Sequence, residues 1–418
     1  MKKTDWYKLD NAAKMYPAIL SRKNPATFRV AVLLKEDIDS EILEKSVNEV
    51  INRFPTMKVK LKKGIFWNYF QENNKPVKIY KEENTPCFFI DANKNNDYLF
   101  RVTYFNKRIS VEIFHALTDG TGGIEFLKSI LYKYLNLKGF SINCENMIIT
   151  NNNYASFDEI EDSYHKIYNK DKTNNKKIKN AQHIKGKSLK NNAINVIHGV
   201  IDSNELLKIS KSFGVTITEY LTALYVLAVF KENKNTKSNP ITINIPVNLR
   251  NMFDSNSLRN FSFFVNVSIK QENYLDFYMV LFEVKKQLRE GIKKENIHSK
   301  LNTMISMDKN VFLRVIPLFL KTMILKNTRR LLSDNIKTST LTNLGVIKLP
   351  NEMNEFVNHF EFMLYCSNPV NINVGICTFG DKLVISMSRS IVETNVIRYF
   401  FNHLSKDLGL DVLIYSND

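Results

Sequence analysis

Cysteine is scarce in this chain of 418 residues, and the few cysteines present are not paired along the sequence. The four of them, Cys87, Cys144, Cys366 and Cys377, lie far apart and form no C-x-x-C motif. This spacing argues against a zinc site and against the disulfide framework of a small secreted domain. We therefore expect free thiols, no metal and a reducing compartment, the cytoplasm.

Long apolar runs are missing as well. The first residues carry two lysines with no apolar stretch after them, so we expect no secretory signal peptide. The most apolar window, residues 311–325, is interrupted by Arg314, Pro317 and Lys321 and is too short to span a bilayer. We interpret it as a core or partner-facing helix. The alternatives are contact with a membrane surface and the lining of a tunnel for a long apolar acceptor. No integral membrane association is expected.

Negative charge is in deficit: 59 Lys and Arg face 42 Asp and Glu, a formal net charge of +17. Such an excess raises a nucleic-acid-binding role. Lysine is spread along the chain among Asn and Ile, however, and no nucleic-acid-binding motif is present. We therefore expect no nucleic-acid partner and rank that role last. A basic surface would equally attract an anionic small molecule, such as a phosphate-bearing cofactor, to a cleft.

Strand and helix patterns alternate in both halves of the chain, which indicates a mixed α/β fold. In the first half, a buried strand at 28–34 precedes a helix that Asp39 caps and Pro55 ends. In the second half, Thr216 and Glu219 have the spacing of a capping box before an apolar helix. Further expected elements are helices at 122–135, 275–291, 309–326 and 393–404, and a hairpin around residues 380–381.

A polar, strongly basic segment without periodicity covers residues 165–192. We interpret it as a surface crossover between two domains, with a phosphate-contacting loop as the alternative. This divides the chain into an N-terminal half, 1–164, a linker, 165–192, and a C-terminal half, 193–418. In a protein of two such halves, the cleft between them is the default place for a site.

The most distinctive motif is His-x-x-x-Asp-Gly, formed by His115, Asp119 and Gly120 directly after the alternating run RISVEIF. A histidine at the end of a strand is held rigidly and can take and return a proton near neutral pH. Asp119, if buried, needs a charged partner elsewhere. Gly120 would supply a backbone conformation that a residue with a Cβ resists. By residue type alone, a histidine before a turn more often has a purely structural role.

The motif HALTDG resembles the HxxxDG signature of the chloramphenicol-acetyltransferase-like superfamily of acyltransferases. Other stretches resemble this superfamily in the expected order: LDNAAKMYP, IPVNLRN, RNFSFFVNVSI and TLTNLGVIKLP. The first is similar to the opening of the bacterial alcohol acetyltransferases. The resemblance implies two α/β domains, an α+β sandwich, with the active site in a tunnel at their interface.

The resemblance also implies a chemistry. His115 would act as the general base of an acyl-CoA-dependent acyltransferase, such as an alcohol acetyltransferase, in a ternary complex without an acyl-enzyme. Asp119 would form a structural ion pair with Arg250. The hydroxyl of Thr342 or the amide of Asn343 would be candidates for the oxyanion site. The expected co-substrate would be an acyl-CoA, namely acetyl-CoA, and no permanently bound cofactor or metal is implied.

The sequence also departs from parts of the superfamily. Condensation domains usually carry two adjacent histidines, whereas Phe114 precedes His115 here. This favours a freestanding enzyme that acylates a small alcohol or amine. The alternatives are a condensation-type enzyme that takes acyl groups from an acyl carrier protein in nonribosomal peptide or polyketide metabolism, and a catalytically silent relative that acts as a binding or scaffold protein.

Overall fold

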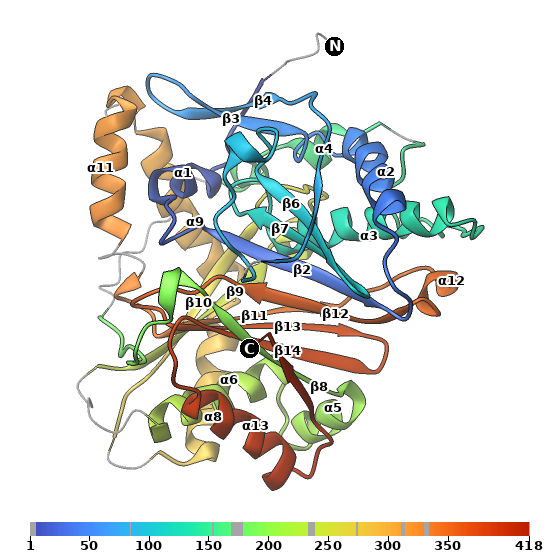
Figure 1. Ribbon diagram of the computed structural model, residues 1–418. Helices are drawn as coiled ribbons and strands as arrows, with labels where there is room; N and C mark the ends of the chain where they lie inside the picture. Colours follow the sequence, from blue (N-terminus) through green and yellow to red (C-terminus); the bar gives the residue numbers. More distant parts are fainter. Residues whose placement is uncertain are drawn as a thin grey trace.

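The computed structural model describes residues 6–83, 85–152, 154–168, 179–232, 239–272, 275–310, 314–329 and 334–417. Within these ranges, three β-sheets and the helices packed on them form two halves, one above the other in Figure 1. A five-stranded sheet organises the upper half, and a seven-stranded sheet organises the lower half. The predicted mixed α/β class is confirmed.

The five-stranded sheet carries the candidate histidine at the end of one strand. In spatial order its strands are β12 (Val357–Leu364), β2 (Thr27–Leu34), β7 (Arg108–Phe114), β6 (Phe100–Phe105) and β5 (Ile79–Lys81). Helices α2 (Ser40–Val50) and α3 (Gly120–Leu137) pack on each other, and α3 packs on β2. Helix α2 begins where the Asp39 side chain accepts from the Ile42 amide, as predicted, and it buries Leu43 and Val47 at helical spacing.

The same sheet also holds a buried row of charged residues. Arg29, Glu112 and Arg101 stand directly opposite one another on β2, β7 and β6. Arg29 Nε lies 2.9 Å from Glu112 Oε1, and Arg101 pairs with the other oxygen of the same carboxylate. Burial raises the pKa of Glu112, but the two arginines outweigh it and hold this pKa below its ordinary value. The carboxylate therefore neutralises part of a cationic row inside the sheet.

The seven-stranded sheet of the lower half is mixed parallel and antiparallel. Helix α6 (Ile217–Glu232), buried almost throughout, packs against α8 (Phe277–Gly291) and α13 (Asn395–Asn402). It starts at the predicted capping box, where Thr216 and Glu219 bond each other's amides at 2.7 and 3.1 Å. The strands, in spatial order, are β10 (Ser262–Ile269), β9 (Ile241–Asn248), β11 (Ser339–Val346), β13 (Ile372–Phe379), β14 (Lys382–Arg389), β8 (Asn195–Asp202) and β15 (Leu413–Ser416).

A small third sheet and several short elements complete the described chain. The sheet has the order β1 (Trp6–Lys8), β4 (Asn68–Glu72), β3 (Val59–Lys63), and it lies at the top of Figure 1. The remaining helices longer than three residues are α1 (Tyr16–Ile19), α4 (Phe157–Ile160), η4 (Ser163–Ile167), α5 (Ser203–Ser212), α7 (Arg250–Phe253), α9 (Lys294–Lys309), α11 (Leu318–Arg329), α12 (Asn351–Asn354) and η7 (His403–Asp407).

One strand crosses from the C-terminal half to the sheet of the N-terminal half, which the sequence did not indicate. Strand β12 comes from the segment assigned to the C-terminal half, yet it pairs with β2 of the N-terminal half from Val357 to Leu364. It also packs against β13 and β14 of the lower sheet. The boundaries at 164 and 192 remain a prediction, and residues 169–178 of the proposed linker lie outside the described residues.

The single helix predicted over 309–326 is wrong. Helix α9 ends at Lys309, and α11 begins at Leu318. Pro317 directly precedes α11, and a proline has no backbone N–H to continue the hydrogen bonds of a preceding turn. The apolar window is therefore divided between separate elements, and residues 311–313 lie outside the described part of the chain.

No single helix among the described residues is long and apolar enough to cross a membrane. The pair α5 and α6 reaches the required length and composition only together, across a bend of 82°.

Replacing Glu112 with Gln should destabilise the protein by about 3–5 kcal/mol, because two largely buried arginines would lose their shared counter-charge. Urea unfolding measures this loss. Glu125→Gln is the matched control: Glu125 pairs with Lys128 one turn along α3 and is more exposed, so its loss should cost less than about 1 kcal/mol. Equal midpoints for the two variants would contradict a stabilising role of the buried row.

Candidate functional site

His115 follows the last residue of β7, where the strand gives way to a tight turn. Its backbone N–H donates to the carbonyl of Ala26 (2.9 Å), which extends the pairing of β7 with β2 by one residue. The Leu117 amide then donates to the carbonyl of Phe114 (2.9 Å), and α3 starts at Gly120. The imidazole is thus attached at the end of an interior strand, five residues before the first residue of the helix.

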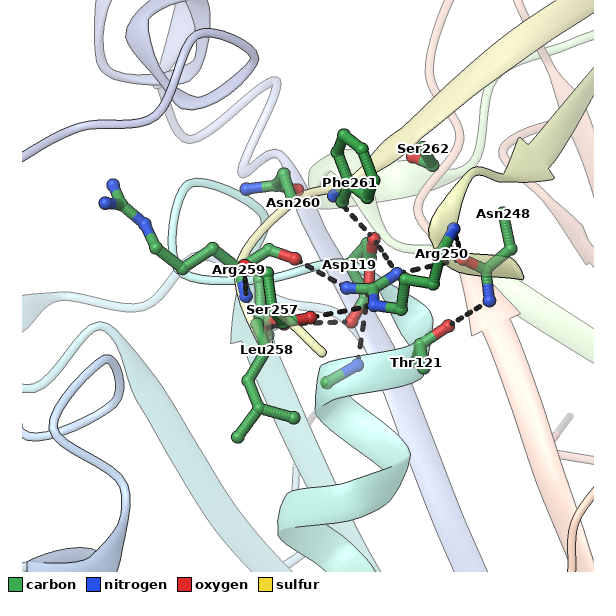
Figure 2. A network of polar contacts seen from close by, with 12 residues as sticks. Asp119, Thr121, Asn248, Arg250, Ser257, Leu258, Arg259, Asn260, Phe261 and Ser262 are labelled. Carbon is green, nitrogen blue, oxygen red and sulfur yellow. Dashed lines mark hydrogen bonds and ion pairs between the residues drawn. The ribbon is translucent and has the colours of Figure 1, made fainter. Parts of the chain in front are cut away.

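Asp119 is the N-cap of α3, and it also binds the other half of the protein. One carboxylate oxygen accepts from the Gly122 amide (3.3 Å) and from Arg250 Nη2 (3.0 Å). The other accepts from Arg250 Nη1 (2.9 Å) and from the Phe261 amide (2.9 Å). Figure 2 shows this two-pronged ion pair. Both side chains are buried, so each charge depends on the other.

Arg250 in turn organises the loop at residues 257–261. Its guanidinium donates to the carbonyls of Ser257 (2.7 Å) and Arg259 (2.6 Å) in addition to Asp119. The same loop accepts a hydrogen bond at the Leu258 carbonyl from Thr118 Oγ1 (2.5 Å). A Cβ at position 122 would lie 2.3 Å from that carbonyl, so glycine there permits the close approach.

The loop carries Asn260 to the imidazole. Asn260 Oδ1 lies 3.1 Å from His115 Nδ1. The amide nitrogen of the same side chain donates to the His115 carbonyl (3.1 Å) and to Asp10 Oδ2 (3.2 Å). Asp10 is fully buried and lies 3.6 Å from Arg259 Nε. Residues 10, 115 and 260 therefore meet at one point.

These contacts determine which imidazole nitrogen carries the proton. The Asn260 amide nitrogen faces two acceptors, so its oxygen is the group turned to His115. An oxygen cannot donate, and Nδ1 must therefore be the protonated nitrogen. In a neutral imidazole, Nε2 then holds the lone pair and is the nitrogen able to accept a proton.

Aromatic rings enclose the imidazole. Tyr16 stacks on it with ring centroids 4.8 Å apart and planes within 9°, and Phe28 meets it edge-on at 5.0 Å. Burial lowers the pKa of His115, while the nearby Asp119 charge and the Asn260 hydrogen bond act in the opposite direction. Burial also favours the uncharged form of Asp10, and it raises the pKa of this carboxyl to about 6 against the attraction of Arg259. Burial thus favours the uncharged form of the imidazole.

The structure does not bear out the role predicted for Gly120. Its φ is not among the positive values of the chain, so no unusual backbone conformation is involved. A Cβ there would instead lie 2.6 Å from the Leu344 side chain. A side chain at this position would require the end of Leu344 to move.

The two oxyanion candidates lie on β11, next to this glycine. Thr342 is buried, and the Asn343 amide nitrogen donates to Thr218 Oγ1 (3.1 Å). Asn343 Oδ1 accepts from the Gly345 amide (2.8 Å) at an irregularity in the pairing with β13. Both candidates thus lie within strand β11, and Gly345 near its end is in the left-handed region (φ 76°). The role of these residues toward an oxyanion stays a prediction.

Three residues around the imidazole, Asp10, Tyr16 and Asn260, were not singled out from the sequence. Asp10 and Tyr16 lie in LDNAAKMYP, and Asn260 opens NFSFFVNVSI, both within the stretches that carry the resemblance. The only signal was thus the resemblance of those segments as a whole. Among the residues that the structure describes, no group of three or more His, Cys, Asp and Glu is arranged to hold a metal ion.

A cavity of about 360 Å³ lies away from this site. It is lined by Leu34, Tyr134, Lys138 and Phe356, among others, at the end of β2 opposite to the end that pairs with Phe114. No residue that contacts the imidazole lines it. The predicted tunnel between the halves therefore remains a prediction, and we assign the site from its side chains.

Comparison with known proteins identifies the fold. No family model matches the sequence, and no curated protein matches it. Among solved structures, polyketide synthase associated protein 5 from Mycobacterium tuberculosis superposes with a TM-score of 0.60 at 11% identity, covering 96% of this chain and 97% of its own. The chain has the two-domain fold of the chloramphenicol-acetyltransferase-like acyltransferases. The expected superfamily resemblance is confirmed at the level of fold.

Two further structures show the range of this fold. The trichothecene 15-O-acetyltransferase of Fusarium sporotrichioides matches with a TM-score of 0.60 at 11% identity, over 96% of this chain and 94% of the other. The first condensation domain of the CDA synthetase matches with a TM-score of 0.58 at 10% identity, over 98% and 96%. Acetyl transfer and condensation thus both occur on the fold.

Replacing Asp119 with Asn should cost about 3–5 kcal/mol of stability in urea unfolding, because it leaves the Arg250 charge buried without a partner. Asp39→Asn is the matched control, since Asp39 caps α2 in the same way but is exposed. Its effect should stay within about 1 kcal/mol. Similar losses in both variants would mean that Asp119 contributes only as a cap.

The hydrogen bond from His115 to Asn260 predicts the Nδ1–H tautomer, which ¹⁵N NMR of labelled histidine detects directly. In Asn260→Ala, the Nδ1–H tautomer of His115 should no longer be favoured over the Nε2–H tautomer. Asn260→Asp should raise the pKa of His115, because a carboxylate beside Nδ1–H favours the charged imidazole. A wild-type protein in the Nε2–H form, or an unchanged pKa in Asn260→Asp, would show that Asn260 does not orient the ring.

Proposed function

We propose that the protein is an acyltransferase in which His115 acts as the general base. The observation that carries this proposal is the orientation of the imidazole, with Nδ1 bound to Asn260 and Nε2 left as the proton-accepting nitrogen. A base of this kind must be neutral at working pH and rigidly placed. Burial favours the neutral ring, and the end of β7, Tyr16 and Asn260 hold it in position.

The donor in this proposal is an acyl-CoA, with acetyl-CoA the first to test, and the acceptor is an alcohol or an amine. His115 Nε2 removes the proton from the acceptor as its oxygen or nitrogen attacks the thioester carbonyl. The tetrahedral intermediate expels the CoA thiolate, which takes the proton from the imidazolium. Both substrates meet at His115 without an acyl-enzyme. Thr342 and Asn343 are the candidate donors to the oxyanion.

Asp119 and Arg250 act as positioning residues in this scheme. Neither side chain carries the proton, because each is occupied by the other in a buried pair. Their task is to hold the turn after His115 against the loop that presents Asn260. The net charge of +17 would favour an anionic donor such as a CoA thioester.

A second candidate is a condensation-type reaction with a carrier-bound donor. It rests on the similarity in fold to condensation domains, one of which covers 98% of this chain. The single histidine, preceded by Phe114, favours a free acyl-CoA instead. The nature of the donor separates the two.

The first test is the release of CoA thiol from acetyl-CoA against a panel of alcohols and amines. Acceptor-dependent release should fall at least about a hundredfold in His115→Ala, as expected for the loss of a general base. Because burial lowers the pKa of His115, the rate should decline only as the pH drops below the ordinary value of about 6.5. His165→Ala is the control, since that histidine is exposed and outside the motif.

Each other outcome has a definite meaning. Release that His115→Ala leaves unchanged contradicts the general-base role. Transfer from a carrier-bound thioester but not from acetyl-CoA establishes the condensation-type alternative. Binding of CoA without turnover of either donor identifies a catalytically silent relative.

A further inference from the structure

Helix α11 reverses the ordinary arrangement of a surface helix, because it buries a lysine and exposes apolar side chains. Its lysine, Lys321, is buried, and the ammonium group lies 3.7 Å from the centre of the Trp67 ring. Phe319 and Met323, four residues apart on the opposite face, are 71% and 60% exposed. A surface helix normally buries its apolar residues and exposes its lysines. Here the apolar face points to solvent.

The tip of the β3–β4 hairpin continues this apolar face. The Leu318 amide donates to the carbonyl of Ile65 (2.9 Å), and Lys321 Nζ donates to the carbonyl of Phe66 (3.1 Å). These bonds attach the helix to the hairpin tip, where Ile65 is 77% exposed. We call the exposed residues together the α11 surface; they are Ile65, Phe66, Val315, Phe319 and Met323.

The segments that carry this surface are basic. Residues 11–20, 60–69 and 314–326 contain no Asp or Glu. Asp97 lies close to Lys60 and Lys62, so the cations best placed to meet an outside charge are Lys63 and Lys326, both exposed. The complete set of cations in these segments is Lys14, Lys60, Lys62, Lys63, Arg314, Lys321 and Lys326.

We propose that the α11 surface docks the protein on an anionic lipid bilayer. Exposed phenylalanine, methionine and isoleucine can enter the boundary between headgroups and acyl chains, while lysines at the rim meet lipid phosphates. The absence of carboxylates in these segments favours a negatively charged occupant over a mixed-charge protein surface. The exposed apolar side chains distinguish the α11 surface from a purely electrostatic site for a soluble anion.

The α11 surface is connected to the candidate site through one short helix. Helix α11 packs against α1, and Tyr16 of α1 stacks on His115. A bilayer that holds the α11 surface would therefore lie on the α1 side of the imidazole. The docking itself rests on the exposed residues and their charge, and it does not depend on the proposed acyltransferase activity.

Sedimentation with lipid vesicles tests the proposal without any enzymatic assay. We expect the full chain to bind vesicles of phosphatidylcholine with about 30% phosphatidylglycerol at about 50 mM salt, and to bind less as salt is raised. Pure phosphatidylcholine vesicles should bind at least about tenfold less. The variant Phe319→Asp/Met323→Asp should lose binding to the anionic vesicles, and Lys63→Glu/Lys326→Glu should weaken it by about tenfold or more.

The matched control lies on α8, where Tyr278 and Phe282 are also four residues apart and are 66% and 65% exposed. Tyr278→Asp/Phe282→Asp adds the same charge to an equally exposed pair and should bind the vesicles like wild type. Circular dichroism checks that all variants are folded. The proposal is overturned if wild type does not bind anionic vesicles, if both Asp pairs reduce binding equally, or if the α11 pair instead abolishes a concentration-dependent dimer in the absence of lipid.

Discussion

The buried pair of Asp119 and Arg250 is the interaction on which the arrangement of the site depends. It joins the N-terminus of α3, in one half, to the loop at 257–261, in the other. Neither charge can be left alone in the interior, so the two halves meet at this point or both charges stay unpaired. Strand β12, which crosses from the C-terminal segment to pair with β2, adds a second connection through backbone hydrogen bonds. The two halves are therefore joined at this buried pair and along the β12 edge of the five-stranded sheet.

The chemistry of the histidine follows from the same pair. Asn260 precedes Phe261, whose amide binds Asp119, so the ion pair also places the side chain that orients the imidazole. Asp10 then turns the Asn260 amide so that its oxygen faces Nδ1. A residue from each of three distant segments thus contributes to the tautomer of one ring. Burial acts in the same sense, because it favours the neutral imidazole that a general base requires.

The α11 surface is unusual because its helix buries a lysine and exposes apolar side chains. Helix α2 follows the usual rule, with Leu43 and Val47 inside. Helix α11 reverses this rule because Trp67 and two backbone carbonyls accept the ammonium group of Lys321. With the lysine inside, the remaining residues of the helix direct an apolar face outward. The exposed face and the basic segments around it together suit a negatively charged lipid surface.

The sequence by itself determined most of the local elements and singled out the His-x-x-x-Asp-Gly motif. Apolar periodicity and caps were enough for α2, α6 and the strand before His115, because these signals act over a few residues. Only the tertiary structure decided that residues 10, 115 and 260 meet, since sheet register and the docking of two halves bring them together. The same applies to β12, where His359 and Glu361 are buried although polar side chains are usually exposed. It applies equally to α11, where the burial of one lysine reverses the face that a periodic pattern would place inside.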